Sequence, residues 1–414
     1  MENQPNYIRS ISLENVRCFG SKQTLYFTQN NQSDGEIAMW NVILGNNGTG
    51  KTTILKGISG LHVVFYDQKN VQWLKYGSYF SVKKSEEYGR MGMILNDFNG
   101  YRYVLNNFSL NVTLAGFIKE EPNDRDRNKA PLFAYGAARK IGTLGISEDL
   151  PDYTLSLFDE QAALLNAEKW LIDAEYLALK GEPQHQKRYE LVKSTLQKLL
   201  KAEVSGFEIK TENNVAKVYF KTHYGEVRLH ELSLGYKTLI AWVTDLASGL
   251  IDSYFISENP LAEPAICLVD EIDLHMHPQM QRNVMKFLRE TFPKTQFICT
   301  AHSPLIVQSG EDANIILLRR KGDEVEVVND VDDAKNWRID QILDSDLFEN
   351  TSSYSPTIEQ KVNKRRAILL KDKPSKREKV ELSKLDDSLD NLSVTESPEY
   401  LQALKILSKV QKNG

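Results

Sequence analysis

The sequence predicts an α/β protein whose core is a parallel sheet with helices on both faces. Three observations point to this class. Continuous apolar runs at 39–44, 265–269 and 296–300 alternate with segments of helical periodicity, which is typical of buried parallel strands. The first run leads directly into the glycine-rich stretch GNNGTGKTT, residues 45–53, and then into a helical segment. Alternating apolar and polar residues elsewhere predict an additional antiparallel β subdomain.

Composition limits the function classes. The chain has 414 residues, of which 41% are hydrophobic and 26% charged, so it is long enough for one large domain or two smaller ones. Its net charge of −5 argues against a strongly basic nucleic-acid surface as its overall character. Three widely spaced cysteines predict a reducing, cytoplasmic location. The polar N-terminus is followed by no apolar run of the kind found in signal peptides, and no apolar window is long enough to span a bilayer. We therefore expect the protein to be neither exported nor membrane-spanning.

Residues 1–150 are expected to form an N-terminal lobe. Its expected elements are two strands within 11–27, the strand at 39–44, a helix over 51–66 and β-rich sequence between 101 and 135. Residues 151–205 are expected to form a helical insert. Its amphipathic helices are predicted at 156–181 and 188–201, with a break at GEPQHQ between them.

Residues 206–330 are expected to form a C-terminal lobe and residues 331–414 a tail. The elements expected in the lobe are antiparallel strands within 206–231, a helix over 236–251, and the strands 265–269 and 296–300 separated by a helix over 278–292. The tail is rich in mixed charge and has only short helical periodicities, which predicts a helical partner-binding or regulatory segment.

The stretch GNNGTGKTT has the form G-x-x-x-x-G-K-[ST] between a strand and a helix, which is typical of a phosphate-binding loop. Glycines permit positive φ angles and a close approach of backbone N–H groups to phosphate oxygens. Lys51 would neutralise the terminal phosphates, and the Thr52 hydroxyl would ligate Mg²⁺. A plain glycine turn is the alternative. The candidate phosphate-binding residues are Gly45, Asn46, Asn47, Gly48, Thr49, Gly50, Lys51, Thr52 and Thr53.

Two carboxylates follow the apolar strand at 265–269. Asp270 would orient Mg²⁺, and Glu271 would polarise the attacking water. A carboxylate pair that caps the next helix is the alternative. His302, in AHSP after the strand at 296–300, is predicted to stabilise charge on the γ phosphate, although a surface histidine is the alternative.

The segment LSLG, residues 232–235, stands just before a predicted helix. Ser233 and Gly235 could therefore present a helix N-terminus to an anion. Gly235 precedes Asp270, the first carboxylate after the strand at 265–269, by 35 positions. By itself the Leu-Ser-x-Gly pattern has little specificity.

Taken in order, GNNGTGKTT, LSLGYKT, ICLVDEID and ICTAHSP resemble the motifs of ATP-binding-cassette (ABC) ATPases, specifically the soluble RecF, SMC and Rad50 branch. The resemblance covers residues 8–320. It implies an ABC-ATPase head with a phosphate-loop sheet, a short helical insert and a helical C-terminal tail. It also implies ATP and Mg²⁺ as cofactors, Thr52 and Asp270 as magnesium ligands, and Glu271 and His302 as catalytic residues.

The same resemblance implies that two heads bind head to tail, as a homodimer or higher homo-oligomer. Ser233 and Gly235 of one head would contact the γ phosphate held by Lys51 of the other. ATP would then hold the dimer together, and hydrolysis would release it.

Two parts of the chain depart from the typical cassette pattern. His277, in DLHMHP, stands where an aspartate is usual, and no glutamine loop is evident, although FAYGAARK with Tyr135 and Arg139 is the candidate for the equivalent region. His275 and His277 beside the carboxylates could suggest a transition-metal site. Imidazoles compete with a hard-ion Mg²⁺ arrangement, so we do not expect such a metal there.

The helical insert is too short for the heptad coiled-coil arms of the SMC and Rad50 proteins, so DNA tethering of that kind is not expected. NWRIDQILDSDLFE, residues 336–349, predicts an amphipathic helix, for which a cap on the core is the plain structural role. It resembles the segment that follows the head in stand-alone antiphage-defence ATPases of the PtuA family, found in Septu systems and with retrons.

This second resemblance implies a switch subunit that controls a separately encoded effector nuclease. The implied partners are an HNH-type, PtuB-like nuclease and, with retrons, a reverse transcriptase and its nucleic acid. The residues after His302 are too few for a Toprim nuclease plus the tail, so no nuclease centre is expected in the chain. The tail would dock a partner or remain a disordered solubilising segment. The rival functions are a RecF-like DNA-binding repair ATPase and an ATP-bound scaffold without turnover.

Overall fold

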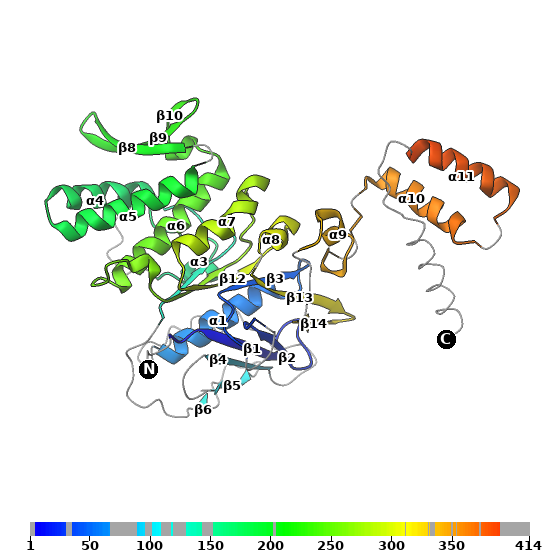
Figure 1. Ribbon diagram of the computed structural model, residues 1–414. Coiled ribbons are helices and arrows are strands. Elements are labelled where there is room, and N and C mark those ends of the chain that lie inside the picture. Colours follow the sequence, from blue (N-terminus) through cyan, green and yellow to red (C-terminus); the bar gives the residue numbers. More distant parts are fainter. Residues whose placement is uncertain are drawn as a thin grey trace. The chain divides into compact units, whose positions relative to one another are not determined.

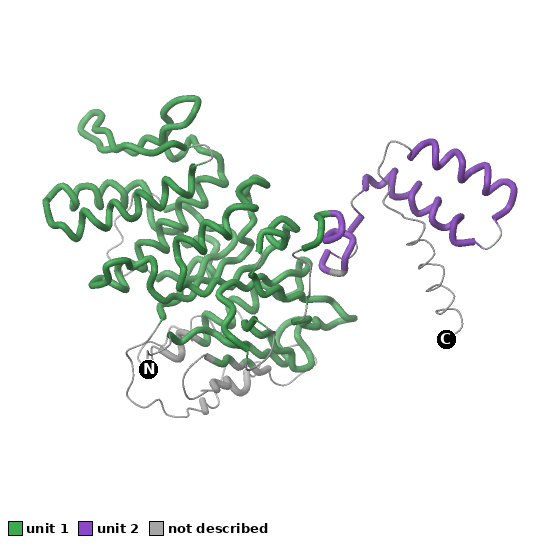
Figure 2. Tube along the Cα trace, in the orientation of Figure 1, with its two compact units in different colours: residues 1–339 green, residues 340–414 purple. Residues whose placement is uncertain are grey.

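The structure is a computed structural model of the chain. It describes residues 5–29, 35–66, 89–95, 102–108, 117–118, 130–142, 152–201, 204–310, 312–329, 331, 336–348, 351–352, 354–371 and 374–389. The chain divides into two compact units, residues 1–339 and residues 340–414, which are coloured separately in Figure 2.

The central sheet of the first unit has six strands in the order β14-β13-β3-β12-β11-β7 (Figure 1), and all neighbours except β13 and β14 run parallel. The strands are β3 (Trp40–Gly45), β7 (Leu132–Tyr135), β11 (Ala265–Val269), β12 (Thr295–Thr300), β13 (Asn314–Lys321) and β14 (Glu324–Val328). The three predicted apolar runs are β3, β12 and β11, which lie side by side. The predicted α/β class with a parallel core is confirmed.

Alternate side chains of the central strands are buried in two different layers, as expected for a sheet covered on both faces. Ile43 and Ile298 belong to a core shared with α1 (Lys51–Tyr66) and β1 (Ile8–Glu14). Their chain neighbours Val42 and Phe297 are also fully buried. Figure 1 shows α6 (Leu234–Ser253) and α7 (Pro278–Thr291) on the side of the sheet opposite α1.

Two antiparallel sheets complete the predicted β component. The first has the order β2-β1-β4-β5-β6, with the additional strands β2 (Gln23–Tyr26), β4 (Gly89–Leu95), β5 (Arg102–Phe108) and β6 (Phe117–Ile118). The second is the sheet β10-β9-β8, made of β8 (Val204–Glu212), β9 (Val215–Thr222) and β10 (Gly225–Arg228). Much of the expected β-rich sequence between 101 and 135 lies outside the described residues.

The helical insert contains the short helix α3 (Leu155–Phe158) and the longer helices α4 (Ala167–Leu179) and α5 (Pro183–Leu200). The predicted helix over 156–181 is only partly correct, because Asn166 caps α4 by accepting a hydrogen bond from the backbone N–H of Lys169 at 2.8 Å. The predicted break is also shorter than GEPQHQ. Pro183 begins α5, because the first helical position needs no backbone N–H.

The remaining described helices are short segments between elements of the first unit, or lie wholly or mainly in the second unit. They are η3 (Leu229–Glu231), η4 (Pro260–Ala262), α8 (Pro304–Ser309), α9 (Ile339–Leu343), η6 (Asp346–Phe348), α10 (Pro356–Leu369) and α11 (Lys376–Leu389). None of the helices in the described part of the chain has both the length and the apolar character required to cross a membrane.

The predicted amphipathic helix over 336–349 is instead two short pieces, α9 and η6. Ser345 lies between them, where its Oγ donates to the carbonyl of Ile342 and accepts from the backbone N–H of Leu347. Such local side-chain bonds compete with the helical pattern. In the tail, α10 and α11 run side by side and are joined by ion pairs that include Arg365–Asp386 at 2.6 Å.

A buried glutamine joins the first antiparallel sheet to the central one. Gln296, in β12, is fully buried, and its amide accepts from the backbone N–H of Ile8 and donates to the carbonyl of Ile8, each at 2.8 Å. The side chain therefore supplies both partners that a neighbouring strand would otherwise give to this residue of β1.

We expect Gln296→Leu to lower the free energy of unfolding by about 2–4 kcal/mol, because two buried backbone groups of Ile8 would lose their partners. Urea unfolding followed by tryptophan fluorescence would measure the change. Gln279→Leu, at an exposed position of α7, is the matched control and should change the stability by less than about 0.5 kcal/mol. Equal effects of the two substitutions would contradict the bridging role of Gln296.

Candidate functional site

The glycine-rich loop connects β3 to α1 in the conformation that the motif predicts. Gly45, Gly48 and Gly50 all have positive φ angles, of 146°, 80° and 90°. A Cβ atom on Gly50 would lie 2.7 Å from Cys18 Sγ, so this position is restricted by space as well as by conformation. Asn46, Asn47 and Gly48 at the tip of the loop are exposed, so its backbone is accessible to a ligand.

Lys51 begins α1, and its ammonium group lies inside the loop. Its Nζ donates to the carbonyls of Gly45 at 2.6 Å and Asn46 at 3.0 Å, and the residue is only 7% exposed. Burial lowers the pKa of Lys51, and the carboxylates of Asp270 and Glu271 oppose that shift. A phosphate ligand would add negative charge beside this ammonium and would favour its charged form.

A chain of hydrogen bonds joins the loop to the carboxylate strand. Thr52 Oγ1 donates to Asp270 Oδ2 at 2.7 Å, and Thr300 Oγ1 donates to Asp270 Oδ1 at 2.6 Å. The backbone N–H of Glu271 donates in turn to Thr300 Oγ1 at 2.7 Å. These residues meet because β12, which ends at Thr300, pairs with β3 on one side and β11 on the other. The predicted Thr52 and Asp270 therefore lie in contact.

Glu271 has an unusual backbone conformation for a residue with a side chain. Its φ is +49°, which typically costs about 1–3 kcal/mol and must be held by its surroundings. Its carbonyl accepts from the backbone N–H of Leu274 at 3.0 Å and from Nη2 of Arg139. Arg139 is fully buried and also has a positive φ, of 36°.

His302 follows β12 at the same edge of the sheet. Its backbone N–H donates to Asp273 Oδ2 at 3.0 Å, and the residue is exposed. The turn after Glu271 is fixed by Gln281 of α7, whose Nε2 donates to the carbonyls of Asp273 at 3.3 Å and Met276 at 3.1 Å. Ser303 Oγ donates to Oε1 of the same glutamine at 2.6 Å. The catalytic roles of Glu271 and His302 remain predictions.

The LSLG segment forms the N-terminus of α6. Ser233 precedes the first helical residue, is exposed and makes no side-chain capping bond. Leu234 is half exposed at 50%. Gly235 is buried against the turn after the carboxylate strand, where a Cβ would lie 2.4 Å from the carbonyl oxygen of His275. No hydrogen bond among the described residues joins Ser233 or Gly235 to the glycine-rich loop of the same chain.

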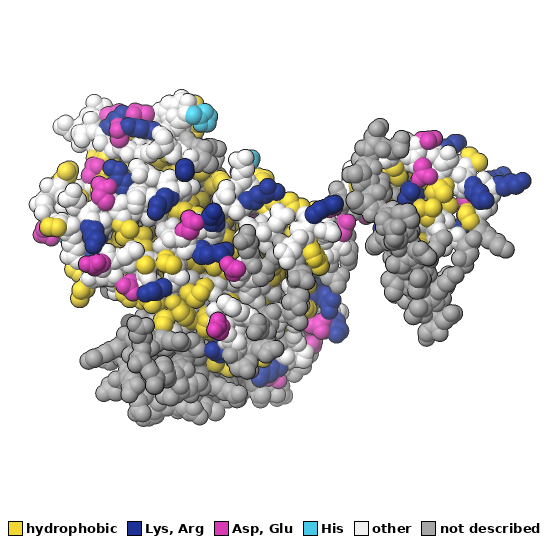
Figure 3. Space-filling model, viewed as in Figure 1, with side chains coloured by type: hydrophobic (Ala, Val, Ile, Leu, Met, Phe, Trp, Pro, Cys, Tyr) yellow, Lys and Arg dark blue, Asp and Glu magenta, His cyan; other side chains and the backbone are white. Residues whose placement is uncertain are grey.

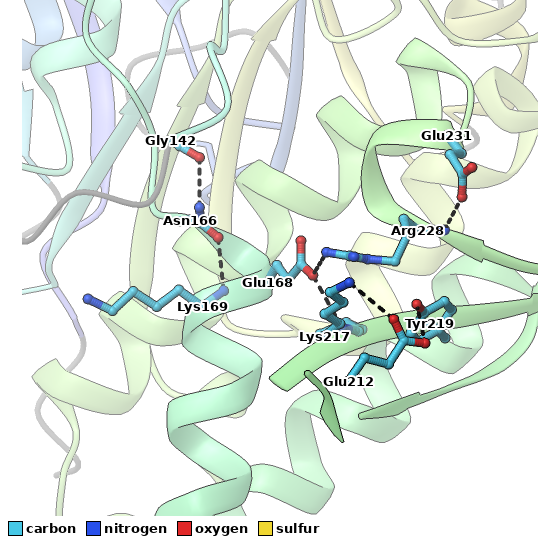
Figure 4. Close-up of polar contacts among 10 residues, drawn as sticks. Gly142, Asn166, Glu168, Lys169, Glu212, Lys217, Tyr219, Arg228 and Glu231 are labelled. Atoms are coloured by element: carbon cyan, nitrogen blue, oxygen red, sulfur yellow. Dashed lines mark hydrogen bonds and ion pairs between the residues drawn. The ribbon is translucent and has the colours of Figure 1, made fainter. Parts of the chain in front are cut away.

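An ion pair positions the segment that precedes Ser233. Figure 4 shows Arg228, at the end of β10, reaching Glu168 in the first turn of α4, with 2.5 Å between Nη2 and Oε1. The backbone N–H of Arg228 donates to Glu231 at 2.6 Å, and the amide of Asn166 donates to the carbonyl of Gly142 at 3.0 Å. The first turn of α4 therefore connects η3, which leads to Ser233, with the loop after β7.

The two histidines of DLHMHP have structural roles in the described chain. His277 caps α7, where its Nδ1 accepts from the backbone N–H of Gln279 at 3.3 Å. His275 is exposed, has a φ of +63° and presents its carbonyl to Gly235. The position that departs from the cassette pattern therefore begins a helix, as an N-cap residue does.

Several residues of the site were not identified from the sequence. Thr300 has the clearest signal, because it is a polar residue at the end of an apolar strand. Asp245, within α6, is buried and accepts from the Tyr135 hydroxyl at 2.9 Å and from the backbone N–H of Leu165 at 2.9 Å. Burial raises the pKa of Asp245, and both hydrogen bonds oppose the shift. Neither Asp245 nor Gln281 belongs to a short motif.

The residues fit ATP and Mg²⁺. A buried ammonium stands within a loop of exposed backbone, which suits a polyphosphate, and a hydroxyl and a carboxylate in contact are hard oxygen ligands of the kind that Mg²⁺ prefers. Thr52 and Asp270 would hold the metal, while Lys51 and the backbone of 46–50 would hold the phosphates. The candidate groups therefore form one site at the carboxyl edge of β3, β12 and β11.

Two family models match parts of the chain. A model described as "AAA domain, putative AbiEii toxin, Type IV TA system" matches residues 171–308, which include LSLG, the carboxylate pair and His302. A model described as "AAA domain" matches residues 10–70, which include the glycine-rich loop. Neither match reaches half of the chain, but both domains are of the ATPase type.

Curated relatives extend the similarity along nearly the whole chain. The Septu protein PtuA of Bacillus mycoides (strain KBAB4) is 26% identical over 390 residues, which is 92% of this chain and 50% of that protein. The Retron Vc95 probable ATPase of Vibrio cholerae is 39% identical over 107 residues, 26% of this chain and 19% of that protein. The chain thus spans half or less of the length of these relatives.

Solved structures give weaker likenesses. The SMC head domain from Thermotoga maritima matches at 13% identity with a TM-score of 0.40, covering 78% of this chain and 99% of that chain. The recombination mediator protein RecF matches at 16% identity with a TM-score of 0.39, covering 79% and 99%. By its sequence, the chain is a homologue of the Septu protein PtuA and of the retron-associated ATPases.

Proposed function

We propose that the chain is the ATP-binding and ATP-hydrolysing switch subunit of a bacterial antiphage-defence complex. The observation that carries the proposal is the hydrogen-bonded chain Thr52–Asp270–Thr300–Glu271, which joins two motifs 218 positions apart in the sequence. Similarity to Septu PtuA and to the retron-associated ATPases supports the biological setting.

Each residue of the site has a separate role in phosphoryl transfer. Lys51 binds and orients the terminal phosphates, and the Asp270 carboxylate orients the metal ligands. Glu271 accepts a proton from the attacking water, and His302 stabilises the charge that develops on the γ phosphate. A bound Mg²⁺ would neutralise charge on the phosphate oxygens. Because metal and nucleotide are held by the same short network, loss of one should weaken binding of the other.

The second half of each nucleotide site is supplied by another copy of the chain. Ser233 and Leu234 are exposed at the N-terminus of a 20-residue helix, where backbone N–H groups favour an anion. Within one chain they make no hydrogen bond to the glycine-rich loop among the described residues. A second copy would bring them to the γ phosphate, and the complex is therefore proposed to be at least a homodimer.

The switch controls a nuclease on a separate chain. An HNH-type protein of the PtuB kind is the proposed partner, and hydrolysis would change its contacts by separating the heads. The rival function is a RecF-like clamp on DNA. The net charge of −5, and the mixture of Lys and Arg with Asp and Glu on the face of the first unit in Figure 3, support the switch over the clamp.

We expect Glu271→Gln to slow ATP hydrolysis by about 10²–10³-fold and to trap a dimer, because nucleotide binding persists while the general base is lost. Light scattering coupled to size exclusion, with and without Mg·ATP, would measure the dimer. Ser233→Arg on that background is the control, since it blocks the second half-site and leaves Lys51 intact. A Glu271→Gln protein that stays monomeric with saturating Mg·ATP would contradict the shared site, and unchanged turnover would support the scaffold alternative.

Lys51→Ala should weaken ATP binding roughly 10–100-fold, because a charge-assisted contact of about 1.5–3 kcal/mol is lost. In a complex purified with its nuclease partner, the same substitution should change the rate of nucleic-acid cutting by a similar factor. Gel-based cutting assays at fixed ATP would compare it with Lys56→Ala, a nearby lysine of α1 outside the loop. Cutting that is indifferent to Lys51 and to ATP would rule out control by the nucleotide.

The isolated chain should bind duplex DNA only non-specifically, with a dissociation constant of about 10⁻⁴–10⁻⁶ M at physiological salt. Fluorescence anisotropy with a labelled duplex would measure this with no nucleotide and with ATP, over a range of salt concentrations. Tight binding that requires ATP and falls steeply with salt would favour the RecF-like clamp over the switch.

A further inference from the structure

We propose that Arg139 is a positioning residue for ATP hydrolysis, which fixes the backbone of Glu271 so that its carboxylate faces the nucleotide. The inference rests on the proposed ATPase function and deepens it. The side chain of Arg139 contacts the backbone of Glu271, just after β11, and acts through Glu271 rather than on the nucleotide itself.

The burial of Arg139 is hard to explain by packing alone. The residue is only 1% exposed, yet its Nε and Nη1 meet no hydrogen-bond acceptor among the described residues. No ion pair in the described part of the chain joins it to a carboxylate. Burial lowers the pKa of Arg139 to about 10, opposed by the charges of Asp270, Asp273 and Glu271. A buried cation whose N–H groups lack acceptors lowers the stability of the fold. Buried charged groups of this kind are concentrated at functional sites.

Among the described residues, the side chain of Arg139 makes one hydrogen bond, which goes to the carbonyl of Glu271. On the other side of the same residue, the backbone N–H of Glu271 donates to Thr300 Oγ1 at 2.7 Å. The two contacts fix both peptide groups of a residue that adopts a positive φ. Thr300 is already tied to Asp270. The carbonyl of Glu271 also accepts from Leu274 within its own turn, so Arg139 adds the contact to this carbonyl that comes from another part of the chain.

The backbone that carries Arg139 is itself held in place. The carbonyl of Lys140 accepts from the backbone N–H of Leu164 at 2.8 Å, and that of Gly142 accepts from the Asn166 amide at 3.0 Å. A Cβ on Gly142 would lie 2.2 Å from the carbonyl oxygen of Leu164. Residues 140–142, just after Arg139, are therefore tied to the segment before α4, and these bonds help to hold the guanidinium against Glu271.

A double-mutant cycle separates this role from a structural one. In the otherwise unchanged chain, Arg139→Ala should lower kcat about 100-fold, because a misplaced general base accepts the proton less effectively. The same substitution should change the Kd for a fluorescent ATP analogue by less than about threefold. On the Glu271→Gln background the same substitution should lower the residual single-turnover rate by less than about threefold, since the group it positions is gone.

Arg139→Lys, which keeps a cation and a donor, should recover part of kcat, and it replaces Arg139→Ala in the cycle if the alanine variant fails to fold. Ser156→Ala, which removes a buried hydroxyl contact to the carbonyl of Ala134 in β7, is the matched control. It should lower the melting temperature with the same small effect on hydrolysis in both backgrounds.

Equal losses from Arg139 substitution in both backgrounds, or an unchanged kcat, would overturn the positioning role and leave the ATPase assignment standing. The ATPase assignment is tested separately in the same assay. If the unchanged chain and Lys51→Ala showed the same turnover, both the proposed function and the role of Arg139 would fall.

Discussion

The carboxylate of Asp270 is the contact on which the candidate site depends. It is 4% exposed, and its two oxygens accept from Thr52 in the first turn of α1 and from Thr300 at the end of β12, so two hydroxyl groups satisfy the charge. These donors are in reach only because β12 lies between β3 and β11. The order of the central strands therefore determines whether the glycine-rich loop and the carboxylate pair belong to one site.

A second buried carboxylate organises the other side of the sheet. Asp245 joins α6 to Tyr135 of β7 and to Leu165 before α4, so the helix that begins at LSLG is tied to the strand beside the carboxylate pair. The ion pair between Glu168 and Arg228 adds the three-stranded sheet to this arrangement. The helical insert is thus joined to the site by a hydrogen bond and an ion pair, although its own sequence contains no catalytic motif.

Much of the fold was predictable because its signals are local. The helix over 51–66 and the strands β3, β11 and β12 follow from periodicity and from one glycine pattern. The boundaries near Pro183 and Ser345 were wrong, because proline is compatible with a first helical turn and a serine side chain can compete for backbone groups. The contact of Arg139 with Glu271 was not predictable, since it joins positions 132 apart through two residues with positive φ.

The closeness of Gly235 to the carbonyl of His275 affects how variants of the LSLG segment should be interpreted. Any side chain at 235 must displace the turn that follows Glu271 in its own subunit. In the proposed dimer, loss of activity in such a variant would have two causes, a displaced carboxylate in one site and a missing contact in the other. Ser233 makes no capping bond within its chain, so its substitution would test the proposed contact between subunits more directly.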